Sequence, residues 1–399
     1  MSALAINERV IEVGASHPER RLFDAIMPIP YGTTYNAYVV IGSEKTALID
    51  AVDPEKRQVL FHNLQEAGIR HLDYIVNLHA EQDHSGVTEE LLQRFPGASL
   101  WTNARVRDLM VTHLHLPESR FTVVADQDTL SLGDRTLRFL LIPFAHWPDN
   151  MMAYLEEDRI LFSSDLFGSH YATDKLFVGE TAGSRVMEAA RTYYAEIMMP
   201  FRSHVARHVA RVRELDPRLI ASSHGPVWYR PNQVLSAYEE WVSDRVRAEV
   251  TIPFVSMHDS TYQMVQRLAS RLADRGVSVS CRNLASRPES LVLETAGMID
   301  DLVDAGAMIL ASPTVMGGLH PAAAYAASTA AAVKPKTRYL GFMGSYGWGT
   351  RAEESFCALT ASIKAERLET VLVKGLAAGE DLARIDALAD RTADLLKAL

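Results

Sequence analysis

The segment Asn77-Leu-His-Ala-Glu-Gln-Asp-His-Ser-Gly86 decides how the rest of this chain is interpreted. It places two imidazoles and two carboxylates within six residues: His79, Glu81, Asp83 and His84. The apolar run at 72–76 predicts a short buried strand before it, and residues 85–95 predict a helix after it. In an extended segment, positions 79, 81 and 83 point the same way. One imidazole and two carboxylates on one face are typical of a metal site.

Composition narrows the class of protein. The chain has 399 residues, 48% of them hydrophobic, which predicts roughly two to three globular domains. No apolar run is long enough to cross a bilayer, and no signal peptide is evident, so we expect a cytoplasmic protein without a membrane partner. The two cysteines, Cys281 and Cys357, form no Cys-x-x-Cys pair and thus predict no disulfide framework, zinc ribbon or rubredoxin-type iron site. A net charge of −10 without a basic cluster argues against a nucleic-acid partner.

The pattern of expected strands and helices changes near residues 248–250. Before this point, runs of strands flanked by helices predict an α+β or layered-sandwich plan, with a hairpin over 37–50. After it, five strand-like runs alternate with helices, which predicts an α/β domain with a parallel, doubly wound sheet. The sequence therefore predicts two domains, 1–249 and 250–399.

Further metal-ligand candidates follow later strand-like runs of the first domain. They are His146 in Phe144-Ala-His-Trp-Pro148, Asp165 in Leu161-Phe-Ser-Ser-Asp165 and His224 in Ser222-Ser-His-Gly225. With the first segment they offer up to three imidazole and three carboxylate ligands, and one imidazole is left over. We expect the strand ends to bring these groups together.

In the second domain, three expected strand ends carry loops rich in small and hydroxyl residues. Backbone N–H groups and hydroxyls at a helix N-terminus can bind a phosphate, and aromatic faces can stack on a flat ring. In a flavodoxin-like strand order these loops meet at the switch point of the sheet. The candidate cofactor-binding residues are Ser256, Met257, His258, Asp259, Ser260 and Thr261; Ser312, Pro313 and Thr314; and Ser345, Tyr346, Gly347 and Trp348.

The ligand spacing resembles the metallo-β-lactamase superfamily, whose usual loop is His-x-His-x-Asp-His. This chain has Glu81 at the second His position, as in the flavodiiron proteins, which use His-x-Glu-x-Asp. The resemblance implies a metallo-β-lactamase-like αβ/βα sandwich followed by a flavodoxin-like domain. Carboxylate-rich ligation of two metals suits iron in redox chemistry, whereas binuclear zinc hydrolases favour imidazole.

The flavodiiron resemblance also implies a ligand set. One iron would have His79, Glu81 and His146, and the other Asp83 and His224, with Asp165 bridging both. His84 matches a family position that lies close to the site but is not normally a ligand, so its role stays open. Segments that look like flavodiiron ones include Gly32-Thr-Thr-Tyr-Asn36, His146-Trp-Pro-Asp149 and Tyr193-Tyr-Ala195. Tyr31 and Tyr194 are expected to pack around the site or behind its ligands, and the alternative hypothesis is that they line the substrate pocket.

The second domain resembles flavodoxins and implies FMN as the flavin. Flavodoxin phosphate loops usually have Gly where this chain has Asp259, and flavodiiron loops have an aromatic residue where it has His258. An acid beside a phosphate dianion is unfavourable unless it points away, so the effect of these two residues on FMN binding stays open. No GxGxxG fingerprint is present, so dinucleotide binding is not predicted.

The resemblance implies an FMN-fed di-iron oxidoreductase that reduces dioxygen to water, nitric oxide to nitrous oxide, or both. An external donor would be rubredoxin, a flavin reductase or reduced deazaflavin F420, and the chains would form a head-to-tail homodimer or a dimer of dimers. The alternatives are a binuclear zinc hydrolase with a regulatory flavodoxin domain and a non-catalytic electron carrier. The sequence does not choose between the two gases, among the donors, or between dimer and tetramer.

Overall fold

The computed structural model of this chain describes residues 3–179 and 183–399. Backbone contacts divide the chain into two compact units. The first comprises Met1–Phe23, Ile29–Tyr194 and Phe201–Val242, and the second comprises Asp24–Pro28, Ala195–Pro200 and Ser243–Leu399. The boundary expected at 249/250 falls inside strand β17 (Arg247–Phe254), because Arg247 already pairs with Ala305 of the second unit.

The first unit contains a seven-stranded mixed sheet in the order β1-β2-β7-β8-β9-β10-β11. Its antiparallel hairpin β7–β8 is the one expected from the sequence, and β8, β9, β10 and β11 then run parallel. The strands are β1 (Leu4–Ala5), β2 (Val10–Glu12), β7 (Tyr38–Ile41), β8 (Thr46–Ile49), β9 (Tyr74–Val76), β10 (Ser99–Asn103) and β11 (Phe121–Val124).

A five-stranded sheet, β12-β13-β14-β15-β16, faces it. These strands are β12 (Thr129–Ser131), β13 (Thr136–Leu141), β14 (Met151–Leu155), β15 (Ile160–Phe162) and β16 (Leu219–Ala221). The inner faces of the two sheets share one apolar core, in which Val40 and Ile49 of one sheet pack with Phe139 and Phe162 of the other. Alternating inward side chains of both sheets thus build the core of a sandwich.

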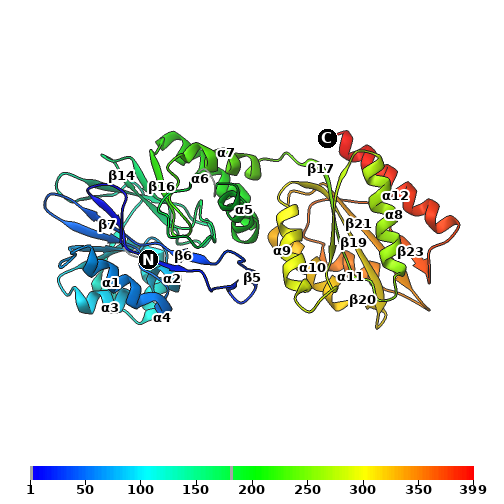
Figure 1. Cartoon of the computed structure of the whole chain (residues 1–399), viewed down its shortest axis with the longest axis horizontal. Coiled ribbons are helices and arrows are strands. Elements are labelled where there is room, and N and C mark those ends of the chain that lie inside the picture. The colour runs from blue at the N-terminus through cyan, green and yellow to red at the C-terminus, as the bar shows by residue number, and fades with distance from the viewer. Residues whose placement is uncertain (1–2, 180–182) are drawn as a thin grey trace. The chain divides into compact units, whose positions relative to one another are not determined.

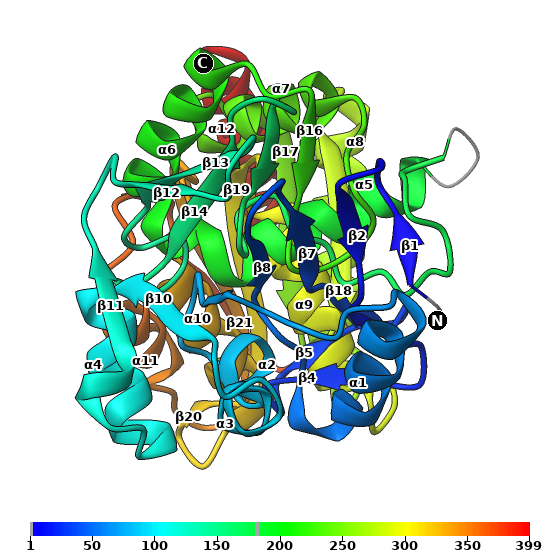
Figure 2. The same ribbon diagram turned by 90° about the vertical axis from the view of Figure 1, so that its left-hand side faces the viewer.

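Helices cover the outer faces of this sandwich, as Figures 1 and 2 show. One side carries α1 (Arg57–Glu66), α2 (Gln82–Ser85), α3 (Thr88–Arg94) and α4 (Ala104–Leu114), and the other carries α5 (Gly183–Tyr193), α6 (Arg202–Leu215) and α7 (Pro231–Val242). The shorter elements are β3 (Ala15–His17), which pairs with β6 (Thr33–Tyr35), and β4 (Leu22–Phe23), β5 (Met27–Pro28), η1 (Pro54–Lys56), η2 (Glu118–Arg120), η3 (Tyr194–Met198) and η4 (Met199–Phe201). The result is the predicted αβ/βα sandwich.

The second unit has a parallel sheet in the order β18-β17-β19-β21, with β22 and β23 both beside β21. Its strands are β17, β18 (Ser278–Asn283), β19 (Ala305–Val315), β20 (Gly318–Leu319), β21 (Tyr339–Tyr346), β22 (Glu366–Arg367) and β23 (Val371–Lys374). Its helices are α8 (Ser260–Asp274), α9 (Ser290–Asp301), α10 (Pro321–Val333), α11 (Ala352–Leu359) and α12 (Glu380–Lys397). Helices α8 and α12 cover one face and α9, α10 and α11 the other (Figure 1). This is the doubly wound order expected from the sequence.

Two local expectations were wrong. Residues 82–85 form the short helix α2, so Asp83 does not lie in an extended segment beside positions 79 and 81. The helix expected over 85–95 begins only at Thr88, after a break at Gly86 and Val87. Within the described ranges, no helix is both long and apolar enough to span a bilayer.

Candidate functional site

Four separate segments of the first unit meet at one edge of the sandwich. Residues 77–84 follow β9, His146 lies between β13 and β14, Asp165 follows β15, and His224 follows β16. Hydrogen bonds hold the first of these loops, because Leu78 N–H donates to Asp50 and Met151 N–H donates to the Leu78 carbonyl. Buried apolar strands thus position every polar side chain of the cluster.

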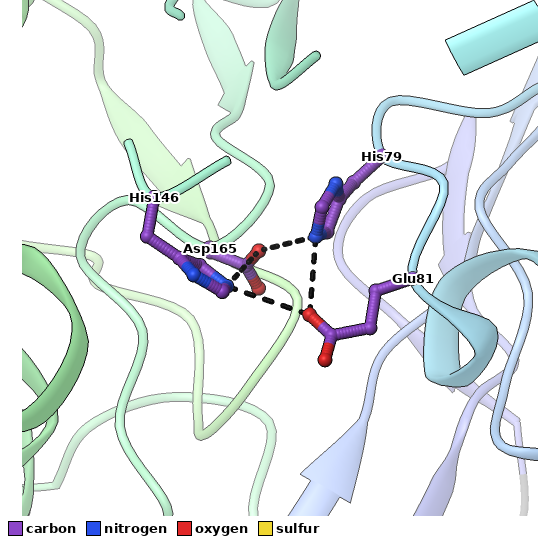
Figure 3. A group of neighbouring side chains, drawn as sticks. All are labelled: His79, Glu81, His146 and Asp165. Atoms are coloured by element: carbon purple, nitrogen blue, oxygen red, sulfur yellow. Dashed lines mark hydrogen bonds and ion pairs between the residues drawn. The ribbon is translucent and has the colours of Figure 1, made fainter. Parts of the chain in front are cut away.

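One group of four side chains, which we call the first half-site, consists of His79, Glu81, His146 and Asp165 (Figure 3). The Glu81 Oε2 atom lies 3.1 Å from His79 Nε2 and 3.4 Å from His146 Nε2. The Asp165 Oδ2 atom lies 3.5 Å from each of the same two nitrogens. Two imidazoles and two carboxylates therefore converge on one point.

A second half-site lies on the other side of Asp165. Its members are Asp83, His84 and His224, which are all buried. The Asp165 Oδ1 atom lies 3.2 Å from His84 Nε2 and 3.5 Å from His224 Nε2. Asp83 lies 3.3 Å from each of these two nitrogens through its two oxygens. Asp165 thus presents one oxygen to each half-site.

Hydrogen bonds from outside the cluster fix the direction of the imidazoles. His79 Nδ1 lies 2.9 Å from Asp149 Oδ2, which also accepts the Ala80 N–H. His224 Nδ1 lies 2.6 Å from the Thr34 carbonyl oxygen, to which it donates. Each ring therefore turns its Nε2 atom toward the half-sites, which is the usual way in which ligand imidazoles are oriented.

Asp165 is held by two donors of its own. Asn150 Nδ2 donates to Oδ2 at 3.3 Å, and the Tyr193 hydroxyl donates to Oδ1 at 3.0 Å.

The turn that carries His224 depends on Gly225, whose φ is +80° and whose position leaves no room for a Cβ against Ser169 Oγ. A side chain at this glycine would therefore displace His224.

The buried histidines and carboxylates of the cluster strongly shift one another's pKa values. Burial alone would lower the pKa of His79, but hydrogen bonds to Asp149 and Glu81 outweigh it and raise the pKa to about 10. Burial would likewise raise the pKa of Asp165, yet the His84, His79 and His146 imidazoles hold it well below its usual range. In the absence of another cation, the buried carboxylates likewise raise the pKa of His84 and His224, which favours the protonated imidazoles.

The donor set fits metal ions. The two Asp83 oxygens and His84 Nε2 are buried, and among the described residues they make ion-pair contacts at 3.2–3.3 Å with the other ligand candidates but no hydrogen bond of proper geometry. Buried charged atoms are costly unless they are paired or bind a metal. Two clusters of imidazole and carboxylate atoms that share one carboxylate match a binuclear site for a first-row transition metal.

The second unit gathers hydroxyls where three neighbouring parallel strands end. The Ser260 and Thr261 hydroxyls lie 3.2 and 3.0 Å from the Ser345 hydroxyl. Asp259 adopts a left-handed conformation at the N-terminus of the fifteen-residue helix α8, and its side chain makes no capping hydrogen bond. The Ser256 hydroxyl accepts the Tyr262 N–H at 3.1 Å instead, and the Ser260 N–H donates to the His258 carbonyl oxygen, so an anion at this helix N-terminus would have to replace these two acceptors.

The third strand end carries exposed aromatic surface. Tyr346 is half-buried and the Trp348 side chain is 97% exposed. Positions 312–314, 345 and 346 were expected in loops, but they lie within the ends of β19 and β21, because pairing between these strands continues through Ser345. The residues still sit at the carboxyl edge, where α/β sheets bind ligands.

Comparison with known proteins identifies the family. Residues 33–225 match the model described as ODP family beta lactamase. A coenzyme F420H2 oxidase of Methanothermobacter marburgensis is 37% identical over 301 residues, which cover 73% of this chain and 72% of that one. A nitric oxide reductase of Moorella thermoacetica is 30% identical over 391 residues, 96% of each chain. The chain belongs to the flavodiiron family. The structure of rubredoxin oxygen:oxidoreductase from Desulfovibrio gigas matches it with a TM-score of 0.93 at 28% identity, over 100% of this chain and 99% of that chain.

The structure brings together all six residues that the flavodiiron resemblance implied as ligands, and it adds His84 to the second half-site. The sequence analysis assigned no role to the residues that hydrogen-bond to these ligands. Asp149 ends the flavodiiron-like segment His146-Trp-Pro-Asp149, whereas the only signal for Asn150 was its proximity to His146 in the chain.

Tyr194 packs away from the cluster, in agreement with the packing expectation and not with the pocket hypothesis. Its hydroxyl donates to the Trp241 carbonyl oxygen, and its ring packs on Tyr238. The neighbouring Tyr193 reaches Asp165 instead. Because adjacent residues at this helix end point in different directions, only one member of the pair can face the flavodiiron cluster.

Proposed function

We propose that this flavodiiron protein reduces dioxygen to water, nitric oxide to nitrous oxide, or both, at a non-haem di-iron site that FMN supplies with electrons. The observation that carries the proposal is the pair of half-sites that share Asp165, each with imidazole and carboxylate donors. The names of the relatives, a nitric oxide reductase and an F420H2 oxidase, support the same class of reaction.

In this proposal His79, Glu81 and His146 hold one iron, and Asp83 and His224 hold the other, while Asp165 bridges the two. His84 is proposed as a further ligand of the second iron, because its Nε2 atom lies as close to Asp165 Oδ1 as the other imidazoles lie to their carboxylates. When bound, the irons and the flavin supply the redox chemistry. The three carboxylates neutralise much of the metal charge and thus favour oxidised iron.

The remaining residues orient and insulate the site. Asp149 fixes the ring of His79, and Asn150 and Tyr193 fix Asp165, so that the donor atoms do not depend on the metals for their positions. The Tyr193 hydroxyl is buried beside Asp165, and burial raises its pKa well above its usual value. It therefore remains a hydrogen-bond donor at neutral pH.

The FMN site is proposed at the carboxyl edge of the second unit. Residues 256–261 would bind the phosphate through the α8 N-terminus and the hydroxyls of Ser260 and Thr261. Residues 312–314 and 345–348 would surround the isoalloxazine ring. Asp259 and His258 are exposed, so neither is forced to face the phosphate.

Electrons are proposed to come from an external donor, which would be rubredoxin, a flavin reductase or reduced F420. A head-to-tail homodimer, alone or within a dimer of dimers, would place the flavin of one chain against the irons of the other. A cytoplasmic location is part of the same proposal. Dilution to monomers should then abolish turnover while both cofactors stay bound, and full-rate monomers would contradict this electron path.

The function is tested by anaerobic reduction of the protein, followed by separate addition of each gas with quantification of the product. We expect water or nitrous oxide in proportion to the electrons consumed. The zinc-hydrolase alternative predicts two zinc ions per chain and no gas consumption. Reduction of the flavin without consumption of either gas would contradict the proposed function.

A further inference from the structure

One cavity of the first unit is lined by no residue of either half-site. Its volume is about 720 Å³, and sites for small organic molecules usually measure roughly 300–1,000 Å³. Its wall has apolar and aromatic surface from Ile6, Ile160, Phe177, Leu219 and Tyr229. Ile6, Phe177 and Leu219 also pack against the core of the sandwich, so the folded sheets hold this wall in place. The cavity thus has the size and the wall of a binding site for a small organic molecule.

Strands β15 and β16 connect this cavity to the metal cluster but also keep the two apart. Ile160 and Leu219 begin these strands, pair with each other and line the cavity. Asp165 and His224 follow the opposite ends of the same two strands. The cavity therefore lies at the start of the strands and the half-sites lie beyond their ends. A molecule bound in the cavity would not be a ligand of the metals.

Most of the charged groups that line the cavity already have partners. Asp158 accepts a hydrogen bond from Arg135 Nε at 2.6 Å, and Arg159 forms an ion pair with Asp216. One oxygen of Glu157 accepts a backbone N–H of strand β13 at 2.8 Å. Glu157 is exposed, so water and salt screen its charge. These groups therefore leave little charge for a ligand to bind or to avoid.

Arg218 is the exception among the charged residues of the lining. In the part of the chain that the structure describes, its guanidinium has no hydrogen-bond or ion-pair partner. A guanidinium offers a planar fork of N–H donors that matches the two oxygens of a carboxylate. The Phe177 and Tyr229 rings line the same cavity, with centroids 6.2 Å apart and an interplanar angle of 74°. One cation without a partner thus lies beside aromatic surface.

We propose that this cavity binds an aromatic carboxylate, whose acid group pairs with Arg218 and whose ring packs against Phe177 and Tyr229. An acid is required because the charge of Arg218 has no other partner. A ring is favoured over an alkyl chain because aromatic side chains gain additional energy from edge-to-face and offset contacts with other rings. The proposed gas reduction uses none of these residues, so this site does not depend on it.

The first test is calorimetric titration of the iron- and FMN-loaded protein, whose metal and flavin sites are already filled. We expect para-iodobenzoate to bind, whereas para-iodobenzamide, which lacks the charge, and acetate, which lacks the ring, should bind more weakly. Arg218→Gln should weaken the binding of para-iodobenzoate about tenfold or more, and Tyr229→Ala about threefold. The control is Arg287→Gln, which removes an arginine of the second unit that is 67% exposed, and it should bind like the wild type.

The second test locates the ligand. In crystals of the loaded protein soaked with para-iodobenzoate, the anomalous signal of iodine should lie in this cavity, with the carboxylate within hydrogen-bond distance of Arg218. Equal affinity of the wild type and Arg218→Gln would overturn the proposal. An iodine peak only near the irons, or binding in crystals without binding in solution, would overturn it as well. Both tests measure binding alone, so their result is independent of whether the protein consumes either gas.

Discussion

Two substitutions of Asp149, one mild and one severe, test how strongly this residue supports metal binding at the first half-site. Its Oδ2 atom accepts hydrogen bonds from His79 Nδ1 and Ala80 N, both at 2.9 Å. Asp149→Asn keeps an acceptor oxygen but removes the charge, whereas Asp149→Ala removes the acceptor. Loss of such an outer partner typically weakens metal binding about 10- to 100-fold, or about 1.4–2.8 kcal/mol. We expect the Asn variant near the lower figure and the Ala variant near the higher one.

The assay is anaerobic competition for ferrous iron with a chromophoric chelator. Only the metal of the first half-site should weaken, because Asp149 does not contact the second. Asp149→Ala should also lower the free energy of unfolding of the metal-free protein by about 1–3 kcal/mol, since it leaves the buried Ala80 N–H unpaired. Asp174→Asn is the control, because that side chain is 84% exposed. Equal iron affinity in all four proteins would refute the reasoning.

Three further predictions concern other parts of the chain. Asp165→Ala should lose both irons by metal analysis, whereas Asp83→Ala should lose mainly one, because only Asp165 faces both half-sites. Burial raises the pKa of Glu12 from 4.5 to about 8, so its contribution to stability is complete below pH 4.5 and is lost as the pH rises to about 8. In urea titrations, Glu12→Gln should remove this decline, which amounts to a few kcal/mol. Lys336→Met should cost less than the roughly 3–5 kcal/mol typical of an uncompensated buried charge, because Asp304, 3.2 Å from Lys336 and 2% exposed, keeps Arg247 at 3.7 Å, and a second Asp304→Asn change should recover most of the loss.

Each of these has a clear contrary result. Equal iron loss from the two aspartate variants would mean that no carboxylate bridges the half-sites. Parallel stability profiles of wild type and Glu12→Gln between pH 4.5 and 8 would mean that the carboxyl is already ionised in the folded chain. A Lys336→Met protein as stable as the wild type would mean that the ion pair is not buried in solution.

Much of the site could be predicted because its ligands lie next to apolar strands. His79, Glu81 and Asp83 fall within five residues, and His146 and His224 each follow a strand-like run. The reason given for Asp83 was nevertheless wrong. It reaches the second half-site from helix α2 and not from an extended loop, because residues 82–85 turn directly after Glu81.

Groups that act through tertiary contacts could not be predicted. Asp149 and Tyr193 lie in segments that resemble flavodiiron ones, but their hydrogen bonds to His79 and Asp165 depend on where β14 and α5 place them, and no local pattern predicts these bonds. The start of β17 at Arg247 likewise depends on pairing with Ala305, far along the chain. Such non-local pairing has no signature in a short window of sequence.

The central claim is that two irons share Asp165. The most direct measurement is anomalous diffraction at the iron absorption edge from crystals of anaerobically purified protein. We predict two iron peaks per chain, one within bonding distance of Asp165 Oδ2, His79 and His146, and the other within bonding distance of Asp165 Oδ1 and His224. A single peak, or zinc peaks at the same two positions in protein that still consumes gas, would contradict the account.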